Sequence, residues 1–508
     1  MGMLSIFDQG APAPCPSPFN LAAHVLARAG DLPDKCALQV IRPAGTESWS
    51  YARLAAAVQG CGTGLLALGL TPGDRVLMRL GNTPEFPVLF LGAIAAGLVP
   101  VPTSAQLTGP EITRMAQVVQ PALIVAGLGV SLPDPQPCPV LPAAALAGMA
   151  SLPPCDWAMG APDRLAYIVF TSGTSGRAQA VAHAHRAIWA RRMMHQGWYG
   201  LREDDRLLHA GAFNWTYTLG TGLMDPWSLG ATALVPGEGV ETGQMPHLLK
   251  QFDATIFAAA PGVYRQMLKR PLPALPHLRH GLSAGEKLPE SLRLAWRDAT
   301  GTEVHEALGM SECSTFISAS PGRPAPAGAT GHPQHGRRVA VLGPEGPVAR
   351  GTPGTLAISR RDQGLFLGYV NDRLETEARF HGEWFLTGDT VAMAEDGAIT
   401  YLGRDDDMMN AGGYRVSPLE VEAALAGCPG LTECAVCEVE VRPGVTVIGC
   451  FYVASEPIAT EQISAFAATR LARYKQPRLY VPLASLPRGP NNKILRRALR
   501  EFAPKEGI

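Results

Sequence analysis

Residues 167–185 read Tyr-Ile-Val-Phe-Thr-Ser-Gly-Thr-Ser-Gly-Arg-Ala-Gln-Ala-Val-Ala-His-Ala-His. The first four are apolar or aromatic and predict a short buried strand. The next residues are all threonine, serine or glycine: Thr171, Ser172, Gly173, Thr174, Ser175 and Gly176. Glycine lets the backbone approach a ligand closely, and exposed N–H groups and hydroxyls can surround phosphate oxygens. The stretch therefore predicts a phosphate-binding loop after a strand, with a flexible Ser/Gly linker as the alternative. It lacks the lysine of the common P-loop.

Composition places the chain among ordinary globular proteins. The chain has 508 residues, of which 46% are hydrophobic and 17% charged, and its formal net charge is −1. This length favours two to four domains, and the charge balance gives no reason to expect a nucleic-acid partner. The N-terminus lacks a signal-peptide pattern, and the most apolar stretch, residues 86–101, is too short to span a bilayer. We expect no membrane association.

The cysteines are scattered and predict free thiols, which favours a cytoplasmic location. Only Cys434 and Cys437 among the ten have the C-x-x-C spacing. Both lie in a segment that reads as a strand, where positions three apart face opposite sides. We therefore do not expect them to form a metal or redox pair.

The order of predicted elements indicates an α/β fold. Short strands alternate with helices up to about residue 269, a pattern typical of parallel sheets flanked by helices. Residues 331–403 hold short strands separated by Gly, Pro and Asp, and predict a β-rich subdomain. The charged run that starts at Arg404 resembles an inter-domain linker. We predict a large N-terminal domain over residues 1–403 and a small, mobile α+β C-terminal domain over residues 404–508.

Further motifs follow the glycine-rich loop in order. Residues 281–289 read Gly-Leu-Ser-Ala-Gly-Glu-Lys-Leu-Pro, and residues 306–312 read Glu-Ala-Leu-Gly-Met-Ser-Glu. Residues 384–389 read Trp-Phe-Leu-Thr-Gly-Asp, and residues 403–418 hold the charged run and a glycine pair. Residues 486–500 read Leu-Pro-Arg-Gly-Pro-Asn-Asn-Lys-Ile-Leu-Arg-Arg-Ala-Leu-Arg. As an ordered set these motifs resemble the adenylate-forming superfamily of acyl- and aryl-CoA synthetases. Residues 217–223 and 283–289 are most similar to its benzoate-CoA ligase branch.

The resemblance implies a two-step ligation that uses ATP, Mg²⁺ and coenzyme A. A carboxylate attacks the α-phosphate of ATP to give an acyl-adenylate and pyrophosphate, and the thiol of coenzyme A then displaces AMP. Both steps gather negative charge, so catalysis should depend on positioning and electrostatic stabilisation. The expected partners are a small carboxylic acid and coenzyme A, and a homodimer is one assembly that we consider.

The resemblance also implies roles for individual residues. Lys493 would be the catalytic cation that touches the attacking carboxylate and the α-phosphate, and Glu312 would hold Mg²⁺ beside the triphosphate. Asp389 would accept the ribose hydroxyls, and Arg404 would hold the ribose or phosphate side. With these and the glycine-rich loop, the ATP/AMP site would comprise Ala284, Gly285, Glu286, Glu306, Leu308, Gly309, Met310 and Ser311.

By the same resemblance, the C-terminal domain would rotate about Asp406 between the two steps. This rotation would exchange Lys493 for Gly412 and Gly413, which would line the coenzyme A channel. The pocket for the acid would comprise Trp215, Tyr217, Ala260, Gly309, Thr315 and Phe316, with core packing as the alternative for each. Their apolar character suits a benzoate-like acid or a short to medium alkyl acid.

The chain departs from the family pattern at several places. Ala178 and Gln179 stand where the family has Pro-Lys, so a cation that faces phosphate is missing. Leu308 replaces the usual tyrosine, and the histidine that benzoate ligases carry near Thr315 is absent. Two other functions therefore remain open: a ligase that loads a free carrier-protein thiol, and a nucleotide- or acyl-binding relative with impaired catalysis. We interpret His183 and His185 as residues at a helix start and not as acid–base groups.

Overall fold

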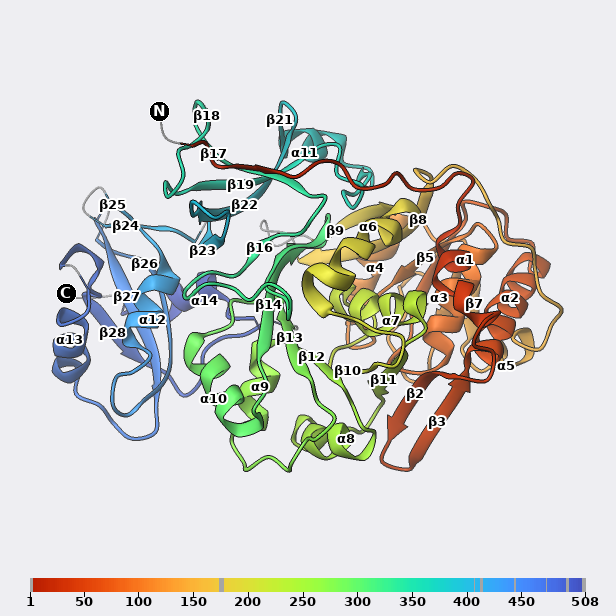
Figure 1. The fold of residues 1–508 in the computed structure, drawn as a ribbon, viewed down its shortest axis with the longest axis horizontal. Coiled ribbons are helices and arrows are strands. Elements are labelled where there is room, and N and C mark those ends of the chain that lie inside the picture. Colours follow the sequence, from red (N-terminus) through yellow and green to blue (C-terminus); the bar gives the residue numbers. More distant parts are fainter. Residues whose placement is uncertain are drawn as a thin grey trace.

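The computed structural model describes residues 3–172, 178–405, 407–411, 414–442, 445–471, 473–489 and 493–504. The chain forms a large N-terminal part and a small C-terminal part, which Figure 1 shows in blue at one end of the molecule. Both parts mix helices and sheets, so the predicted α/β class is confirmed. Among the described residues, no helix is long and apolar enough to cross a bilayer.

A nine-stranded sheet forms the centre of the N-terminal part. Its strands run in the order β16-β15-β14-β13-β12-β10-β11-β2-β3, parallel from β14 to β2 and antiparallel at both edges. Their bounds are β16 His332–Pro333, β15 Ser314–Ser318, β14 Val304–Met310, β13 His280–Ala284, β12 Ile256–Ala259, β10 Arg206–His209, β11 Thr232–Pro236, β2 Cys36–Arg42 and β3 Gly45–Ser50.

Helices cover both faces of this sheet because its strands are apolar on both faces. Leu208 and Phe257 pack in one apolar cluster, whereas their neighbours Leu207 and Ile256 pack in another, as the two-residue period of a strand requires. The helices α8 Met245–Gln251, α9 Pro261–Met267 and α10 Glu290–Thr300 cover the first face. On the second face lie α6 Arg186–Met194 and η2 His195–Tyr199. Nearby run η3 Thr218–Met224 and α7 Asp225–Leu229, whereas η4 Thr242–Gln244 lies beside α8 and α9.

A second parallel sheet lies nearer the N-terminus. It has the order β5-β4-β6-β7, with β5 Val99–Pro102, β4 Arg75–Arg79, β6 Leu123–Ala126 and β7 Val140–Pro142. Its helices are α2 Tyr51–Ala67, α3 Glu85–Ala95, α4 Gly109–Val119 and α5 Ala145–Met149, preceded by α1 Leu21–Val25 and η1 Ala27–Ala29. Helix α3 is buried on all sides from Phe86 to Ala95, which explains why this stretch is the most apolar of the chain.

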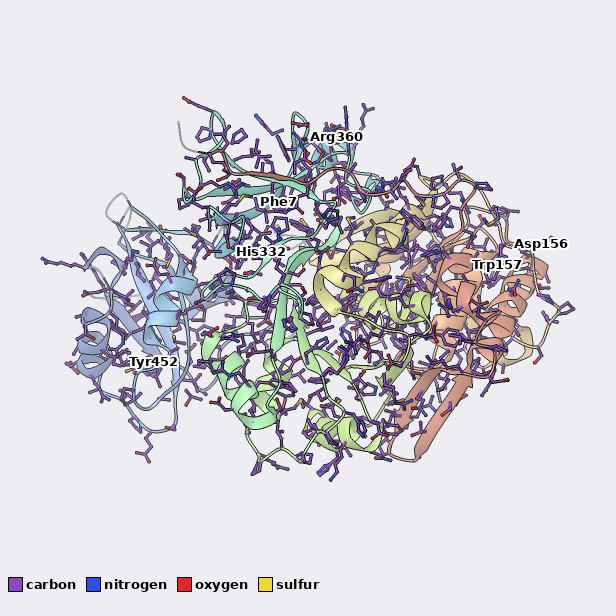
Figure 2. The ribbon with its side chains drawn as sticks, in the orientation of Figure 1. Phe7, Asp156, Trp157, His332, Arg360 and Tyr452 are labelled. Carbon is purple, nitrogen blue, oxygen red and sulfur yellow. The ribbon has the colours of Figure 1, made fainter. Side chains whose placement is uncertain are left out.

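The predicted β-rich subdomain is an antiparallel sheet of seven strands. It contains β1 Ile6–Asp8, β17 Arg338–Gly343, β18 Gly346–Pro347, β19 Gly354–Ser359, β21 Phe380–His381, β22 Trp384–Met393 and β23 Ile399–Arg404, with α11 Arg373–Ala378 beside it. Strand β1 pairs with β17, so the N-terminal segment runs along this sheet far from its own sequence neighbours (Figure 1). Figure 2 labels Phe7 of this strand, which lies opposite Val339 of β17 and is buried in the main hydrophobic cluster.

The C-terminal part has a hairpin, a three-stranded sheet and short helices. The strands are β24 Met409–Ala411, β25 Tyr414–Val416, β26 Leu431–Arg442, β27 Val445–Ala454 and β28 Leu479–Pro482. The helices are α12 Pro418–Leu425, α13 Thr460–Ala468, η5 Arg473–Lys475, α14 Arg496–Leu499 and η6 Arg500–Phe502. Cys434 and Cys437 pack in different apolar clusters on opposite faces of β26, as predicted from their spacing. Tyr452 lies inside this part (Figure 2).

Apolar clusters do not cross the boundary at Arg404. Within the described residues, every cluster draws its members either from residues before Arg404 or from residues after it. Polar contacts join the two parts across the boundary. Arg265 of α9, for example, forms an ion pair with Glu433 of β26 at 3.3 Å. Each part therefore has a hydrophobic core of its own.

Several elements differ from the sequence predictions. The helix expected to start near His185 is α6, whereas strand β9, Ala178–Ala184, before it was not predicted. The ten-residue strand β22 carries Gly388 and Asp389 in its middle, where the sequence suggested a loop. The starts of two helices agree with the sequence, because the side chains of Asn20 and Ser50 cap the N-termini of α1 and α2. His183 lies in β9 and not at a helix start, whereas His185 is the N-cap residue of α6.

Candidate active site

A cleft of about 1160 Å³ opens between the two parts of the chain. Strands β13 and β14 are parallel neighbours that end at Ala284 and Met310, so the segments that follow them leave the sheet at the same edge. Open α/β sheets bind ligands at such carboxyl ends. The cleft wall combines residues from this edge with residues of the C-terminal part: Gly285, Glu286, Glu306, Arg404, Lys493 and Arg496.

The strands on either side of the glycine-rich segment pair with each other as a β-hairpin. Strand β8, Leu165–Ser172, pairs antiparallel with β9, and β20, Gly368–Tyr369, pairs with β9 on its other side. Thr171 and Ser172 thus belong to β8, and Thr171 lies opposite Gln179. The predicted phosphate-binding residues Gly173, Thr174, Ser175 and Gly176 lie outside the described residues.

Glu312 lies beside this hairpin, just beyond the end of β14. Its side chain is buried, and Oε1 accepts a hydrogen bond of 2.7 Å from the hydroxyl of Tyr369 on β20. Burial and the neighbouring Glu312 raise the pKa of Tyr369, so the phenol stays protonated and keeps donating. No sequence pattern marks Tyr369, because β20 has only two residues and lies far along the chain.

Asp389 and Arg404 are cross-strand neighbours on β22 and β23. Arg404 donates from Nη1 to Oδ1 of Asp389 at 3.1 Å and to the carbonyl of Thr387 at 2.9 Å. Burial raises the pKa of Asp389, and Arg404 opposes that rise. The pairing therefore holds a buried carboxylate near the start of the C-terminal part.

Lys493 reaches the cleft from the C-terminal part. The backbone N–H of Gly489 donates to its carbonyl at 2.8 Å, and Arg488 forms a β-bridge with Ile494, so these two segments lie side by side. The side chain is open to solvent within the cleft, yet the surrounding protein removes enough water to lower its pKa. The negative charges of Glu286 and Asp389, both in the N-terminal part, oppose this effect.

The carboxylate of Glu306 is engaged by neighbours on its own side of the cleft. Lys287 donates to Oε2 at 2.8 Å, and the backbone N–H of Leu288 donates to Oε1 at 2.9 Å. Burial raises the pKa of Glu306, and Lys287 opposes the rise. The sequence assigned no role to Lys287, which lines the cleft and binds Glu306 there.

Part of the predicted acid pocket comes together around Trp215. Its ring is 5.2 Å from that of Tyr217 in an edge-to-face arrangement, and both belong to the cluster that contains Ala284. A Cβ at Gly285, where φ is +96°, would lie 2.8 Å from the Trp215 ring. Ala260 precedes α9 at the end of the neighbouring strand β12. Only glycine therefore lets this indole lie against the backbone at Gly285.

The other predicted pocket residues lie differently. Phe316 packs in the main hydrophobic cluster, next to partly buried Leu308 and Met310. Gly309 lies at a bulge between β14 and β15, where a Cβ would be 2.3 Å from the carbonyl oxygen of Ser314. Thr315 follows on β15, opposite Gly309. The predicted hinge Asp406 and the channel residues Gly412 and Gly413 lie outside the described residues.

This two-part architecture, with its cleft at the end of a parallel sheet, is that of the AMP-binding enzymes. The family model "AMP-binding enzyme" matches residues 26–370, and the model of its C-terminal domain matches residues 420–493. The chain belongs to this family, which confirms the resemblance drawn from the motifs.

Relatives place the chain more closely within the family. It is 30% identical to a 3-hydroxybenzoate–CoA ligase of Aromatoleum sp. (strain CIB), over 90% of this chain and 92% of the relative. It is also 30% identical to the human mitochondrial acyl-coenzyme A synthetase ACSM2A, over 96% of this chain and 91% of that relative. A benzoate CoA ligase structure from Burkholderia xenovorans LB400 superposes with a TM-score of 0.85 at 28% identity, over 95% of this chain and 100% of that one.

Proposed function

We propose that this protein, an AMP-forming acid–CoA ligase, activates an aryl acid of the benzoate type or a medium-chain apolar acid. The observation that carries the proposal is the cleft between the two parts. Lys493 and Glu286 line this cleft from its two sides, and Glu312 lies near the same edge of the sheet beside the paired strands β8 and β9. Edge-to-face aromatic rings at Trp215 and Tyr217 offer the acid an apolar, rigid wall.

The residues present suit a Mg²⁺–nucleotide. Glu312 supplies one fixed, buried carboxylate, and Mg²⁺ is commonly held by one or two carboxylates together with substrate phosphates. When bound, the ion would neutralise the triphosphate. The ammonium of Lys493 would align the acid carboxylate with the α-phosphate, and Asp389 would accept the ribose hydroxyls while Arg404 keeps it in place.

Coenzyme A would be the thiol that displaces AMP, and the relatives named as CoA ligases support it. We propose that residues 404–508 turn about Asp406 for this step, which would bring Gly412 and Gly413 to the channel. The separate hydrophobic cores of the two parts support this division of the chain. A free carrier-protein thiol remains the alternative acceptor, and an impaired binding protein is the alternative without catalysis.

One assay separates these functions. The protein is incubated with Mg-ATP and a panel of benzoate-like and alkyl acids, and release of pyrophosphate is followed with and without coenzyme A. Pyrophosphate together with consumption of coenzyme A supports the ligase. Pyrophosphate without consumption of coenzyme A favours the loading of a carrier protein. Absence of pyrophosphate with every acid would contradict both ligase functions and favour the impaired relative.

Gln179 lies opposite Thr171 at the base of the glycine-rich hairpin, where the family has lysine. We predict that Gln179→Lys lowers the KM for ATP by about tenfold, because a hydrogen bond to a charged group contributes roughly 1.5–3 kcal/mol. Steady-state pyrophosphate release at varied ATP measures the effect. Gln179→Met serves as the uncharged control of similar length. An unchanged KM in the lysine variant would mean that hydroxyls and backbone N–H groups suffice.

The lowered pKa of Lys493 predicts a pH dependence. Adenylation needs the charged ammonium, and a lowered pKa means that the proton is lost at a lower pH than from an ordinary lysine. The rate of pyrophosphate release should therefore decline on the alkaline side below the usual lysine range. In Lys493→Arg, which stays charged, the residual activity should lack this decline. A decline shared by both proteins would assign it to another group.

We propose a cytoplasmic location, which the ten free cysteines support because disulfides are rare there. A homodimer is the assembly that we would test first, by light scattering of the purified chain.

A further inference from the structure

One carboxylate of the C-terminal part binds arginines from both sides of the boundary at Arg404. Oε1 of Glu433 accepts from Nη1 of Arg265 at 3.3 Å, and the same oxygen accepts from Nη2 of Arg488. Arg265 belongs to the N-terminal part, whereas Arg488 belongs to the C-terminal part. A carboxylate oxygen has two lone pairs and can accept from two donors at once. Glu433 therefore links the two parts of the chain through a single atom.

The two-residue period of strand β26 brings Glu433 to this position. Alternate residues of a strand point to the same face of its sheet. Ala435 packs in a cluster with Leu486 and Ile494, which lie on either side of Lys493 in the sequence. Glu433 is two positions before Ala435 on β26 and shares its face. The side chain of Glu433 therefore lies on the face that the segment with Lys493 covers.

The backbone connects this link to Lys493. Arg488, which binds Glu433, forms a β-bridge with Ile494, the residue after Lys493. The N–H of Gly489, the residue after Arg488, donates to the carbonyl of Lys493 at 2.8 Å. The two arginine contacts of Glu433 therefore tie the backbone around Lys493 to helix α9 of the N-terminal part.

Arg265 lies on the N-terminal side of the same cleft as Lys493. It belongs to the last turn of α9, the helix that follows Ala260, and both Arg265 and Lys493 line the cleft. Burial raises the pKa of Glu286 in the cleft wall, and cations from both parts oppose this rise: Lys493, Arg488, Arg265 and Arg496. The ion pair between Arg265 and Glu433 is thus formed in the arrangement in which Lys493 acts on the N-terminal wall of the cleft.

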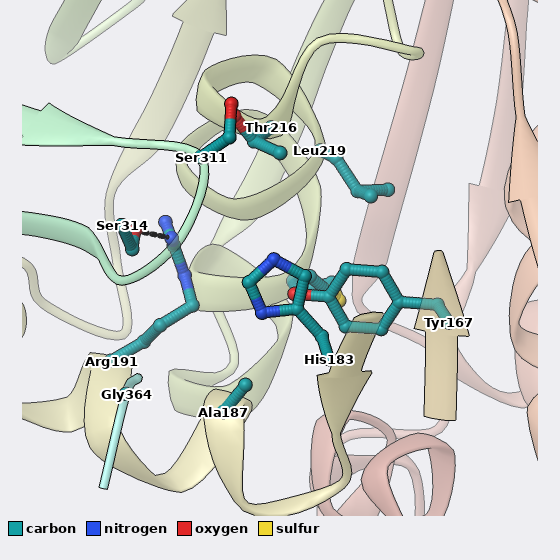
Figure 3. Close-up of a pocket in the computed structure, with 10 residues that line it drawn as sticks. Tyr167, His183, Ala187, Arg191, Thr216, Leu219, Ser311, Ser314 and Gly364 are labelled. Carbon is teal, nitrogen blue, oxygen red and sulfur yellow. Dashed lines mark hydrogen bonds between the residues drawn. The ribbon is translucent and has the colours of Figure 1, made fainter. Parts of the chain in front are cut away.

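The exposure of this ion pair suits a contact that forms and breaks. A buried pair differs: Arg191 pairs with Asp225 at 2.6 Å inside the N-terminal part and also donates to Ser314, as Figure 3 shows. Breaking a buried pair leaves an uncompensated charge and is costly. Arg265 and Glu433 are both partly exposed, so water hydrates their charges when the pair opens. Their contact can bias the position of the C-terminal part without locking it.

We propose that Glu433 is a positioning residue for adenylation, which holds residues 404–508 through Arg265 in the arrangement that brings Lys493 into the cleft. The inference rests on the proposed function, including the turn of this part between the two steps. That turn would separate Glu433 from Arg265, whereas Arg488 would move together with Glu433. The ion pair across the boundary therefore favours the first step and opposes the second.

The test measures the two half-reactions separately in Arg265→Met, which leaves the pair of Glu433 and Arg488 in place. Adenylation is followed as pyrophosphate release from acid and Mg-ATP, and thioester formation starts from synthetic acyl-adenylate and coenzyme A. The ratio of the adenylation rate to the thioester rate should fall by about two- to fivefold, as the loss of an exposed ion pair implies. Glu433→Gln should lower the ratio at least as much, and adding Arg265→Met to it should cause no further change.

Three comparisons separate positioning from a general effect of the substitution. Arg265→Lys keeps the charge and should retain the ratio. Arg360→Met removes an ion pair of 3.4 Å with Glu377 inside the N-terminal part and should leave the ratio unchanged (Figure 2 labels Arg360). Added salt screens exposed charges, so it should lower the ratio in the wild-type protein and have a smaller effect in Arg265→Met.

Several outcomes would overturn the inference. An unchanged ratio in Arg265→Met and in Glu433→Gln contradicts the positioning role and leaves the ligase function standing. The same holds if both half-reactions lose activity equally, because the residues would then act on the fold alone. Additive falls in the double variant would mean that Arg265 acts independently of Glu433. Absence of pyrophosphate with every acid contradicts the ligase function itself, and the positioning role with it.

Discussion

Lys493→Ala is expected to remove adenylation and to spare thioester formation. The structure places Lys493 in the lining of the cleft, and the charges of Glu286 and Asp389 oppose the lowering of its pKa. Loss of one aligned donor to a developing charge typically costs about 10²–10³ in rate. Pyrophosphate release from acid and Mg-ATP should fall by at least that factor. Thioester formation from synthetic acyl-adenylate and coenzyme A should proceed at a rate close to wild type.

The control for this prediction is Lys250→Ala, an exposed lysine on α8 outside the cleft lining. It should leave both half-reactions unchanged. Equal loss of both half-reactions in Lys493→Ala would contradict a role confined to the first step, and with it the proposed rotation of residues 404–508.

Asp225→Ala should cause the largest loss of stability among single substitutions in the N-terminal part. Asp225 is fully buried and accepts hydrogen bonds from Arg191 and from the Tyr199 hydroxyl, at 2.6 and 2.7 Å in their shortest contacts. Its removal leaves the Arg191 guanidinium buried without a counter-charge. Breaking a buried pair in this way costs roughly 3–5 kcal/mol. Urea unfolding followed by tryptophan fluorescence should show a correspondingly lower midpoint.

The matched control is the exposed pair of Arg338 and Glu383, whose oxygen and nitrogen are 2.5 Å apart. Glu383→Ala should shift the midpoint little, because exposed ion pairs contribute about 0–1 kcal/mol. The double variant Arg191→Met/Asp225→Leu should be more stable than Asp225→Ala, since it leaves no unpaired charge. A shift in Asp225→Ala no larger than that in Glu383→Ala would mean that water or another group reaches Arg191.

The roles of Asp389 and Lys493 come from short ordered motifs and stay predictions. In the structure, Lys493 lines the cleft, and Asp389 pairs with Arg404, which lines it too. Local composition did not predict two strands, β9 and β22, because their residues are typical of other structures. Alanine alternates through β9, and Gly388 interrupts β22, so neither segment has the apolar pattern of a strand.

Partnerships between distant segments gave no sequence signal. Tyr369 reaches Glu312 across 57 positions, and Arg191 reaches Asp225 across 34. The hydrophobic periodicity of one segment says nothing about which polar side chain of another will meet it.

The separate hydrophobic cores on either side of Arg404 have a consequence for the energy of domain motion. Parting two surfaces that share an apolar core would cost about 25 cal/mol for every Å² exposed to water. Here the facing surfaces carry the ion pair of Arg265 and Glu433, whose side chains are 40% and 23% exposed. Breaking such a pair costs little, because water hydrates both charges. If residues 404–508 rotate in every turnover as we propose, separating these polar surfaces would cost little free energy. Salt would then change the fraction of time that the ion pairs between the two parts are formed.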